Sequence, residues 1–263
     1  MVAIAIYFSA ARVHHNRIVG NYSGHGLYLS GADATVYANV IENNWSRGVV
    51  VFGGGSPVIF RNVIRGNGST DVGYGSGILA YPTEPGRMVV ADNLIVGNHG
   101  YEGGGLSIFS AENSHSTWVN NTFADNTASH FGAQATIGRE DFADGDNRGL
   151  VFANNVFSGE GISVHCISPT GESPVFDHND VYPAAGGDCA ETAVTGSNFS
   201  ADPKFTLGNN GRPYHLSPES PLVDAGSNDA AREIHRDLGK RPRVIDGGHG
   251  PIVDIGAYEY WPK

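Results

Sequence analysis

The strongest constraint on the fold is a short phrase that returns along most of the chain. The phrase places an apolar residue two positions after Asn and a second Asn three positions further on. It is read as NRIVGN from Asn16, NVIENN from Asn39, NVIRGN from Asn62, NLIVGN from Asn93 and NTFADN from Asn121, and it loses its second Asn in NVFSGE from Asn155 and NDVYPA from Asn179. Successive first Asn residues lie 23, 23, 31, 28, 34 and 24 positions apart. A unit of about 23 residues that accepts insertions therefore repeats.

Each repeat also contains two strand-forming segments before the Asn. One is led by glycine and is read as GLYLS from Gly26, GVVVF from Gly48, GILAY from Gly77, GLSIF from Gly105 and GISVH from Gly161. The other is a short strand that leads into the Asn, as in TVYAN and PVIFRN. Three short strands per unit without helical periodicity predict an all-β fold, a parallel β-helix solenoid with about seven to eight coils.

The repeated Asn has a structural explanation. A coil turns sharply between its strands, and Asn tolerates the left-handed conformation that such a corner needs. Stacked Asn side chains also form hydrogen bonds from coil to coil. We therefore interpret these Asn residues as corners aligned along the solenoid, with a structural and not a catalytic role.

The repeat from Ile4 to about Tyr182 resembles the right-handed parallel β-helix repeat of pectate-lyase-like proteins. The phrases SADPKF, YHLSPESPLVDAGSND, DLGKRPR and VDIGAYEY follow in that order, and they resemble the C-terminal segment of bacterial choice-of-anchor Q β-helix proteins. The resemblance implies a single-stranded right-handed solenoid at residues 1–182. It also implies a loop-rich C-terminal segment at 183–263 that packs on the solenoid within the same domain.

Composition limits the partners of the protein. The chain has 16 Lys and Arg against 27 Asp and Glu, a net charge of −11. This balance argues against nucleic acid and against strongly acidic polysaccharides, because the sequence shows no local basic patch. No stretch is long and apolar enough to span a membrane.

The two cysteines, Cys166 and Cys189, both lie near the end of the repeats. A bridge between them would clip the loop PAAGGDC onto the last coil and would suit an exported protein. The alternative is a pair of small unpaired side chains.

The N-terminal stretch MVAIAIYFSAA is apolar but lacks the basic start of a signal peptide. It aligns with the strand, turn and strand that precede each Asn, so we expect a coil there. An uncapped coil exposes strand edges. We expect either a fragment of a longer protein or a homo-oligomer that forms through this N-terminal edge.

Alternation along the glycine-led strands, with Leu27 and Leu29 inward, places two columns of side chains on the outer surface. One column reads Tyr28, Val50, Leu79, Ser107, Gln134 and Ser163, and the other reads Ser30, Phe52, Tyr81, Phe109, Thr136 and His165. Neither column contains a carboxylate, although the resemblance implies acidic or calcium-binding residues on this face. The aromatic residues predict a stripe that stacks on sugar rings, made of Tyr28, Phe52, Tyr81 and Phe109. The alternative is that another subunit or the C-terminal segment, with Tyr258, Tyr260 and Trp261, covers the stripe.

Candidate catalytic residues lie in the loops just before these strands. They are Glu102, His130, His25 and Arg47, which would supply a general acid, a general base and charge stabilisation. Tyr74 and Tyr101 lie beside them and complete the predicted substrate-binding set. The alternative is that these loop residues are simply solvated.

A further loop, GREDFADGDNRG from Gly138, gathers oxygen ligands that suit calcium. We take Asp141, Asp144 and Asp146 as candidate calcium ligands, with Glu140 and Asn147 nearby. The remaining histidines show no metal-ligand spacing.

Two functions of different classes follow. One is a secreted bacterial enzyme that recognises and cleaves a polysaccharide as a glycoside hydrolase or polysaccharide lyase. The other is a non-enzymatic cell-surface or adhesion β-helix that binds glycan or protein. The fold alone does not choose between them.

Overall fold

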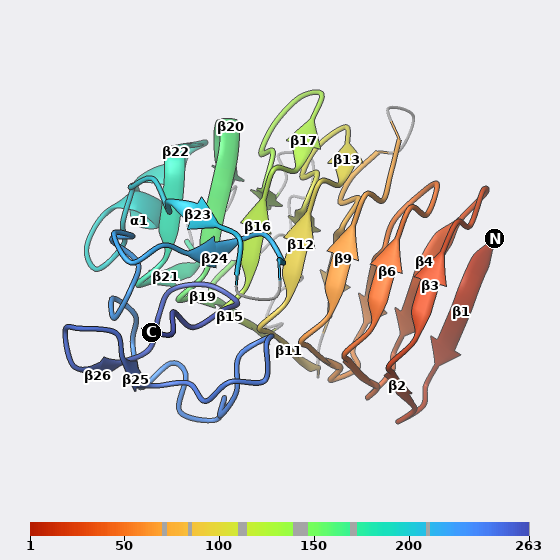
Figure 1. The fold of residues 1–263 in the computed structure, drawn as a ribbon. Coiled ribbons are helices and arrows are strands. Elements are labelled where there is room, and N and C mark those ends of the chain that lie inside the picture. The colour runs from red at the N-terminus through yellow and green to blue at the C-terminus, as the bar shows by residue number, and fades with distance from the viewer. Residues whose placement is uncertain are drawn as a thin grey trace.

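The computed structural model describes residues 1–69, 73–83, 86–109, 115–138, 147–168, 173–208 and 211–262. Within these residues the chain forms a solenoid in which every coil contributes one strand to each of three faces (Figure 1). Strands on the same face of successive coils pair in parallel. The predicted all-β, right-handed parallel β-helix is confirmed, and the described residues make seven complete coils.

The first face is formed by the glycine-led strands. It contains β1 (Val2–Tyr7), β4 (His25–Ser30), β7 (Val49–Gly53), β10 (Ile78–Pro82), β14 (Leu106–Ile108), β18 (Ala135–Ile137) and the end of β20 (Val156–Cys166). The second face contains β2 (Arg12–His14), β5 (Thr35–Tyr37), β8 (Val58–Phe60), β11 (Arg87–Ala91), β15 (His115–Val119), β19 (Leu150–Ala153) and β21 (Val175–Asp177). The prediction that the N-terminal stretch forms a coil is confirmed by β1 and β2.

The third face follows each ladder Asn. It contains β3 (Arg17–Val19), β6 (Val40–Glu42), β9 (Val63–Arg65), β12 (Leu94–Val96), β16 (Thr122–Ala124), the start of β20 and the start of β22 (Asp180–Gly186). Short elements lie outside the faces: β13 (His99–Gly100), β17 (Thr127–Ala128), α1 (Ala190–Val194), β23 (Phe205–Thr206), β24 (His215–Leu216), β25 (Ile245–Asp246) and β26 (Pro251–Ile252).

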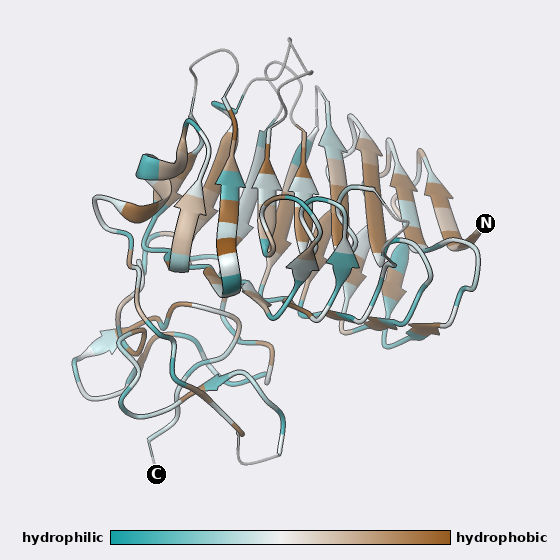
Figure 2. Ribbon diagram, turned by 90° about the horizontal axis from the view of Figure 1, so that it is seen from above, coloured by the Kyte–Doolittle hydropathy of each residue, from teal (hydrophilic) through white to brown (hydrophobic). Residues whose placement is uncertain are grey.

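The core changes in character along the solenoid. Inward residues of the first coils are aliphatic, as at Ile41 and Ile64, which are fully buried. Later coils use stacked rings, with Phe123 and Phe157 at 4.9 Å between ring centroids and Phe152 and Phe176 at 5.2 Å. The period-2 alternation of the strands thus fills one continuous core (Figure 2).

The repeated Asn residues form the predicted ladder. The Asn93 side chain donates from Nδ2 to Asn121 Oδ1 at 3.0 Å and receives Asn62 Nδ2 on its own Oδ1 at 3.0 Å. Equivalent contacts join Asn16, Asn39, Asn62, Asn93, Asn121, Asn155 and Asn179, and the ladder continues to Asn198. A second ladder joins Asn21, Asn44, Asn67, Asn98 and Asn126 and ends on Gln134.

The left-handed corner lies one residue before the position that the sequence suggests. The residue preceding each ladder Asn has the positive φ, as at Asp92 (54°) and Asn120 (53°), and the prediction that the ladder Asn itself takes this conformation is wrong. The reason is visible at Asn93, whose backbone N–H and side-chain Nδ2 both donate to Asn121 Oδ1. Asn93 makes these two hydrogen bonds directly before the next strand, and the chain turns at the residue before it, Asp92.

These corner residues also hold the C-terminal segment. In successive coils Asp92 pairs with Arg243, Asn120 Nδ2 donates to the carbonyl oxygen of Asp254 at 3.0 Å, and Asn154 Nδ2 donates to that of Ser227 at 3.0 Å. The corners of the last coils therefore anchor the chain that follows them.

Apolar contacts place the C-terminal segment on the third face. Leu94, Val96 and Ala124 pack with Ala257 and Tyr258, and Figure 2 shows the segment beside the half of the solenoid farthest from the N-terminus. None of the contacts described for this segment involves the aromatic stripe on the first face. Among the described residues, the apolar cluster that holds Phe109, Tyr28 and Tyr81 contains first-face and adjoining loop residues.

The phrases DLGKRPR and VDIGAYEY interlock with each other. Asp237 accepts the N–H of Arg241 at 2.7 Å and that of Glu259 at 3.0 Å. Arg243, whose side chain is 1% exposed, donates to Glu259 at 2.9 Å. The charged residues of these phrases thus serve to close the C-terminal segment, since buried charges need partners.

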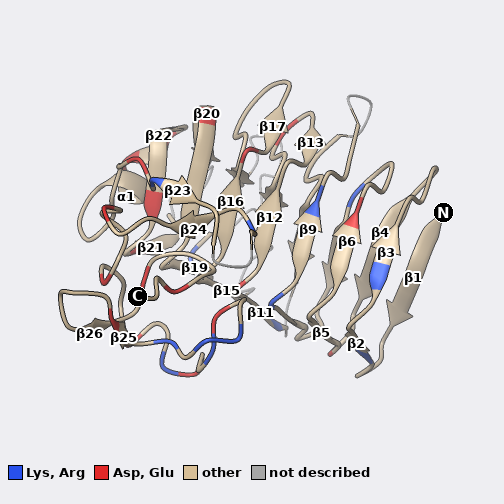
Figure 3. Cartoon of the chain, viewed as in Figure 1, with Lys and Arg blue, Asp and Glu red and all other residues tan. Residues whose placement is uncertain are grey.

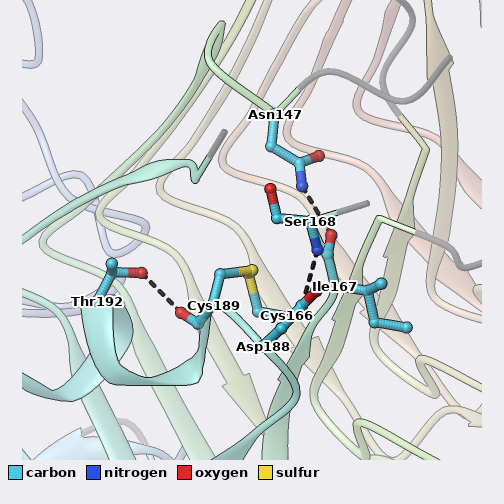
Figure 4. The surroundings of a disulfide bond; sticks show 7 residues. All are labelled: Asn147, Cys166, Ile167, Ser168, Asp188, Cys189 and Thr192. Atoms are coloured by element: carbon cyan, nitrogen blue, oxygen red, sulfur yellow. Dashed lines mark hydrogen bonds between the residues drawn. A yellow bond between two sulfur atoms is a disulfide. The ribbon is translucent and has the colours of Figure 1, made fainter. Parts of the chain in front are cut away.

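The predicted bridge between Cys166 and Cys189 is confirmed (Figure 4). It joins the end of β20 to the residue before α1. Beside it the backbone N–H of Ser168 donates to Asp188 Oδ1 at 2.8 Å, and Thr192 Oγ1 donates to the carbonyl oxygen of Cys189 at 2.7 Å. The bridge closes the last coil.

Candidate functional site

Loops of three successive coils fold back over the outer surface of the first face, and a glycine makes each turn. Gly75, Gly103 and Gly132 have φ angles of 62°, 60° and 61°. A Cβ atom at Gly103 would lie 2.1 Å from the carbonyl oxygen of Leu106, so any other residue would push the loop off the sheet. The glycines therefore bring the residues before them close to the strands.

Those preceding residues are Tyr74, Glu102 and Phe131, and they stack from coil to coil. Tyr74 and Glu102 form a parallel bridge, and the N–H of Gly103 donates to the carbonyl oxygen of Phe131 at 3.1 Å. Ser107 Oγ, on the strand below, donates to the carbonyl oxygen of Glu102 at 3.1 Å. A carboxylate is thus fixed on the outside of a face whose strands carry none.

Glu102 and His130 make a direct pair. His130 Nδ1 lies 2.9 Å from Glu102 Oε1, and the two side chains are 44% and 13% exposed. The imidazole is also held by rings, since Tyr101 stacks on it at 5.1 Å and Phe131 lies 3.7 Å from it, centroid to centroid. When Nδ1 carries the hydrogen that Glu102 accepts, Nε2 carries the lone pair, which is the arrangement of an imidazole general base.

His25 and Arg47 form a second pair on the other side of Tyr74. The Arg47 backbone N–H donates to His25 Nδ1 at 3.4 Å, and Arg47 Nε donates to the carbonyl oxygen of Tyr74 at 2.7 Å. Burial, together with the charges of Arg47 and the N-terminus, lowers the pKa of His25 to about 4. His25 is therefore neutral at pH 7. Of the four predicted catalytic residues, the structure brings Glu102 and His130 together and leaves the other two as a separate pair.

The predicted aromatic stripe lies on this face. The Phe52 and Tyr81 rings lie 5.8 Å apart and those of Tyr81 and Phe109 5.1 Å apart. Phe52 is 49% exposed, whereas Phe109 is 2% exposed, with Tyr74 packed edge-on against it at 5.3 Å. Tyr28, in turn, contacts Tyr7 at 5.8 Å. Phe52, Tyr81 and Tyr28 thus present partly exposed rings, and the buried Phe109 packs against Tyr81.

The register corrects the outward columns expected from the sequence. Ser107 pairs with Thr136 and Thr136 with His165, so these two residues belong to the column of Tyr28, and Gln134 and Ser163 do not. His165 consequently stacks on Phe131 at 4.4 Å, next to the Glu102 and His130 pair. Thr136 and His165 were thus predicted to point outward but were assigned to the wrong column, because insertions shifted the alignment. A glycine lies three positions before each strand, at Gly75, Gly103 and Gly132, and aligning these glycines gives the observed register.

The candidate calcium ligands Asp141, Asp144 and Asp146 lie outside the described residues, as does Glu140. Within the part of the chain that the structure describes, no three His, Cys, Asp or Glu side chains converge in a way that would hold a metal ion. In the same part, no helix has the length and apolarity needed to cross a bilayer.

Comparison with known proteins agrees with the architecture. Residues 1–123 match the family described as the right handed beta helix region. Searches of curated proteins and of solved structures found no match to the chain. The fold and this match define a right-handed parallel β-helix protein, an architecture that is compatible with a polysaccharide-related or surface role.

Proposed function

We propose that this chain is a bacterial extracellular protein that binds a polysaccharide along the first face and cleaves it beside Glu102 and His130. The observation that carries the proposal is that Tyr74 links this carboxylate and imidazole pair to the row of aromatic rings, because its backbone bridges to Glu102 and its ring packs on Phe109. Aromatic faces suit the apolar faces of sugar rings. The resemblance to pectate-lyase-like and choice-of-anchor Q proteins supports the same class of substrate.

In this proposal His130 transfers the proton and Glu102 holds and stabilises the imidazole. His130 Nε2 takes a proton, from the attacking water in a hydrolase or from a sugar carbon in a lyase, and the imidazolium so formed gives the proton to the glycosidic oxygen as the bond between that oxygen and the sugar carbon breaks. Glu102 accepts the hydrogen bond of Nδ1–H, which fixes the tautomer and stabilises the imidazolium once the proton has moved. Tyr101 and Phe131 hold the ring in place.

The test is turnover on a polysaccharide panel, read both as new reducing ends and as unsaturated products. Glu102→Gln keeps the volume and removes the ionisable group, so we expect a fall in kcat of about 100- to 10,000-fold with substrate binding retained. The matched control is Glu160→Gln, because Glu160 occupies the same position before Gly161 in a later coil and is exposed. Full activity in Glu102→Gln would contradict the assignment. Binding without turnover in the unmodified protein would favour the adhesion function.

A further inference from the structure

A cavity of about 620 Å³ lies on the third face, where the C-terminal segment arches over the strands. Its floor is apolar and is made by outward residues of successive coils, namely Val40, Val63, Leu94 and Val96. One wall belongs to the C-terminal segment. The first-face site uses none of these residues, so the cavity is a separate place for a ligand.

At one side of the cavity two arginines share one carboxylate: Arg65 and Glu42 line the cavity, and Arg17 reaches Glu42 from the preceding coil. Arg17 Nε lies 2.5 Å from Glu42 Oε1, and Arg65 lies 2.7 Å from Glu42 Oε2. The Glu42 side chain is 3% exposed, whereas those of Arg17 and Arg65 are 69% and 54% exposed. Figure 3 shows them as neighbouring blue, red and blue positions on β3, β6 and β9.

Arg17, Glu42 and Arg65 together keep a net positive charge. Burial alone would raise the pKa of the Glu42 carboxyl, but the hydrogen bonds from Arg65 and Arg17 outweigh it and hold this pKa below its ordinary value. Glu42 is therefore ionised and neutralises one of the two guanidinium groups. One positive charge remains at this side of the cavity, with exposed N–H donors.

The opposite wall is rigid and carries another cation. Arg212, Tyr214 and Tyr258 line it. The Tyr214 hydroxyl donates to Asp125 Oδ2 at 2.8 Å, and its ring packs edge-on against Phe205 at 5.5 Å. A ligand in the cavity thus meets tyrosine rings on one side and arginines on both sides.

We propose that this groove binds an acidic oligosaccharide, whose anionic group is received by Arg17 and Arg65 while its sugar faces lie on the apolar floor and the tyrosine wall. Guanidinium groups suit carboxylate and sulfate oxygens. The strands that line the cavity belong to three coils and span about 10 Å at the usual strand spacing; with Arg17 on the preceding coil the span is about 14 Å, which suits a short oligosaccharide. The sequence indicated no basic patch, and the structure corrects this, because stacking brings arginines from different repeats together.

The affinity for acidic sugars is measured by calorimetry on the full chain. The probes are hyaluronan tetrasaccharide, which carries carboxylates, neocarratetraose, which carries sulfate esters, and neutral chitotetraose. We expect at least one acidic probe to bind more tightly than the neutral one, and the better of the two identifies the anionic group. Arg65→Gln should weaken its binding about 10- to 100-fold, as loss of a charged hydrogen bond predicts. The matched control is Arg12→Gln, an exposed arginine on the second face, which should change nothing.

A second variant separates binding from stability. Glu42→Gln removes the internal carboxylate without changing its size, so both guanidinium groups become available and acidic probes should bind several-fold more tightly. If Glu42→Gln does not fold, Arg212→Gln on the other wall should weaken binding instead. Equal binding of acidic and neutral probes, or unchanged affinity in Arg65→Gln, would overturn the proposal. Glu102→Gln should leave this binding intact, so failure here is distinct from failure of the first-face site.

Discussion

Replacing a ladder Asn by Ala should lower the free energy of unfolding by an amount that depends on how deeply the Asn is buried. Asn93→Ala tests this at a buried position. The Asn93 side chain is fully buried. Its Nδ2 donates to Ile59 O at 2.9 Å, Ala91 O at 3.0 Å and Asn121 Oδ1 at 3.0 Å, and its Oδ1 accepts the backbone N–H of Asn62 at 2.9 Å and the Nδ2 of Asn62 at 3.0 Å. The amide NH2 has two hydrogens, so these contacts amount to four hydrogen bonds with one hydrogen shared between two acceptors. At about 1 kcal/mol for each hydrogen bond, the variant should lose about 4 kcal/mol of unfolding free energy.

The buried N–H of Asn62 adds to this loss, because it is left without its acceptor. Native domains are stable by only about 5–15 kcal/mol, so Asn93→Ala should remove about a quarter or more of the total. Urea unfolding, followed by circular dichroism and by tryptophan fluorescence, measures the change in midpoint, and an unchanged slope would show that both proteins unfold to the same extent.

The matched control is Asn16→Ala, at the exposed end of the same ladder. The Asn16 side chain makes two hydrogen bonds, to His14 O at 2.9 Å and to Asn39 Oδ1 at 3.1 Å, and water can replace both. We expect a loss of about 0.5–1 kcal/mol there. Equal losses at Asn16 and Asn93 would refute the argument that burial gives the ladder its strength.

Two further predictions concern stability. Reduction of the bridge between Cys166 and Cys189, which are 23 residues apart, should lower the free energy of unfolding by about 3 kcal/mol, measured by urea unfolding with and without reductant; an unchanged midpoint would contradict this. Burial raises the pKa of Asp180 from 3.8 to about 7, so the folded state holds this proton more tightly than the unfolded state, and stability should fall as the pH rises from about 4 to about 7 and level off above that. Melting temperatures across this range should decline less in Asp180→Asn than in the unmodified protein, and parallel curves would disprove the assignment.

Much of the candidate site follows from the period of the repeat. Glu102 and His130 are 28 residues apart, which equals the separation of Asn93 and Asn121, so they were expected in adjacent coils and the structure pairs them. The same arithmetic fits Glu42 and Arg65, which are 23 residues apart and pair on the third face. The signal for that pair was present in the repeat.

Insertions of different length explain why the repeats were misaligned at other positions. The columns of outward residues slipped at Gln134 because the loops before the strands differ in length, and the pairing of Thr136 with Ser107 and His165 became clear only from the hydrogen-bonded register. The left-handed conformation was likewise predicted for the ladder Asn, whereas the residue before it has the positive φ. Side chains as different as Ala38 and Asp92 occupy that position, so its residue types carry no common signal.

The sequence by itself determined the solenoid, because each Asn ladder contact repeats one local rule from coil to coil. Only the tertiary structure decided where the C-terminal segment lies. Its anchors join residues far apart in the chain, such as Asn120 and Asp254 at a separation of 134 and Asp92 and Arg243 at 151. Contacts of this kind occur once and have no period, so they depend on the shape and charge of the finished coils. The groove between that segment and the third face exists for the same reason.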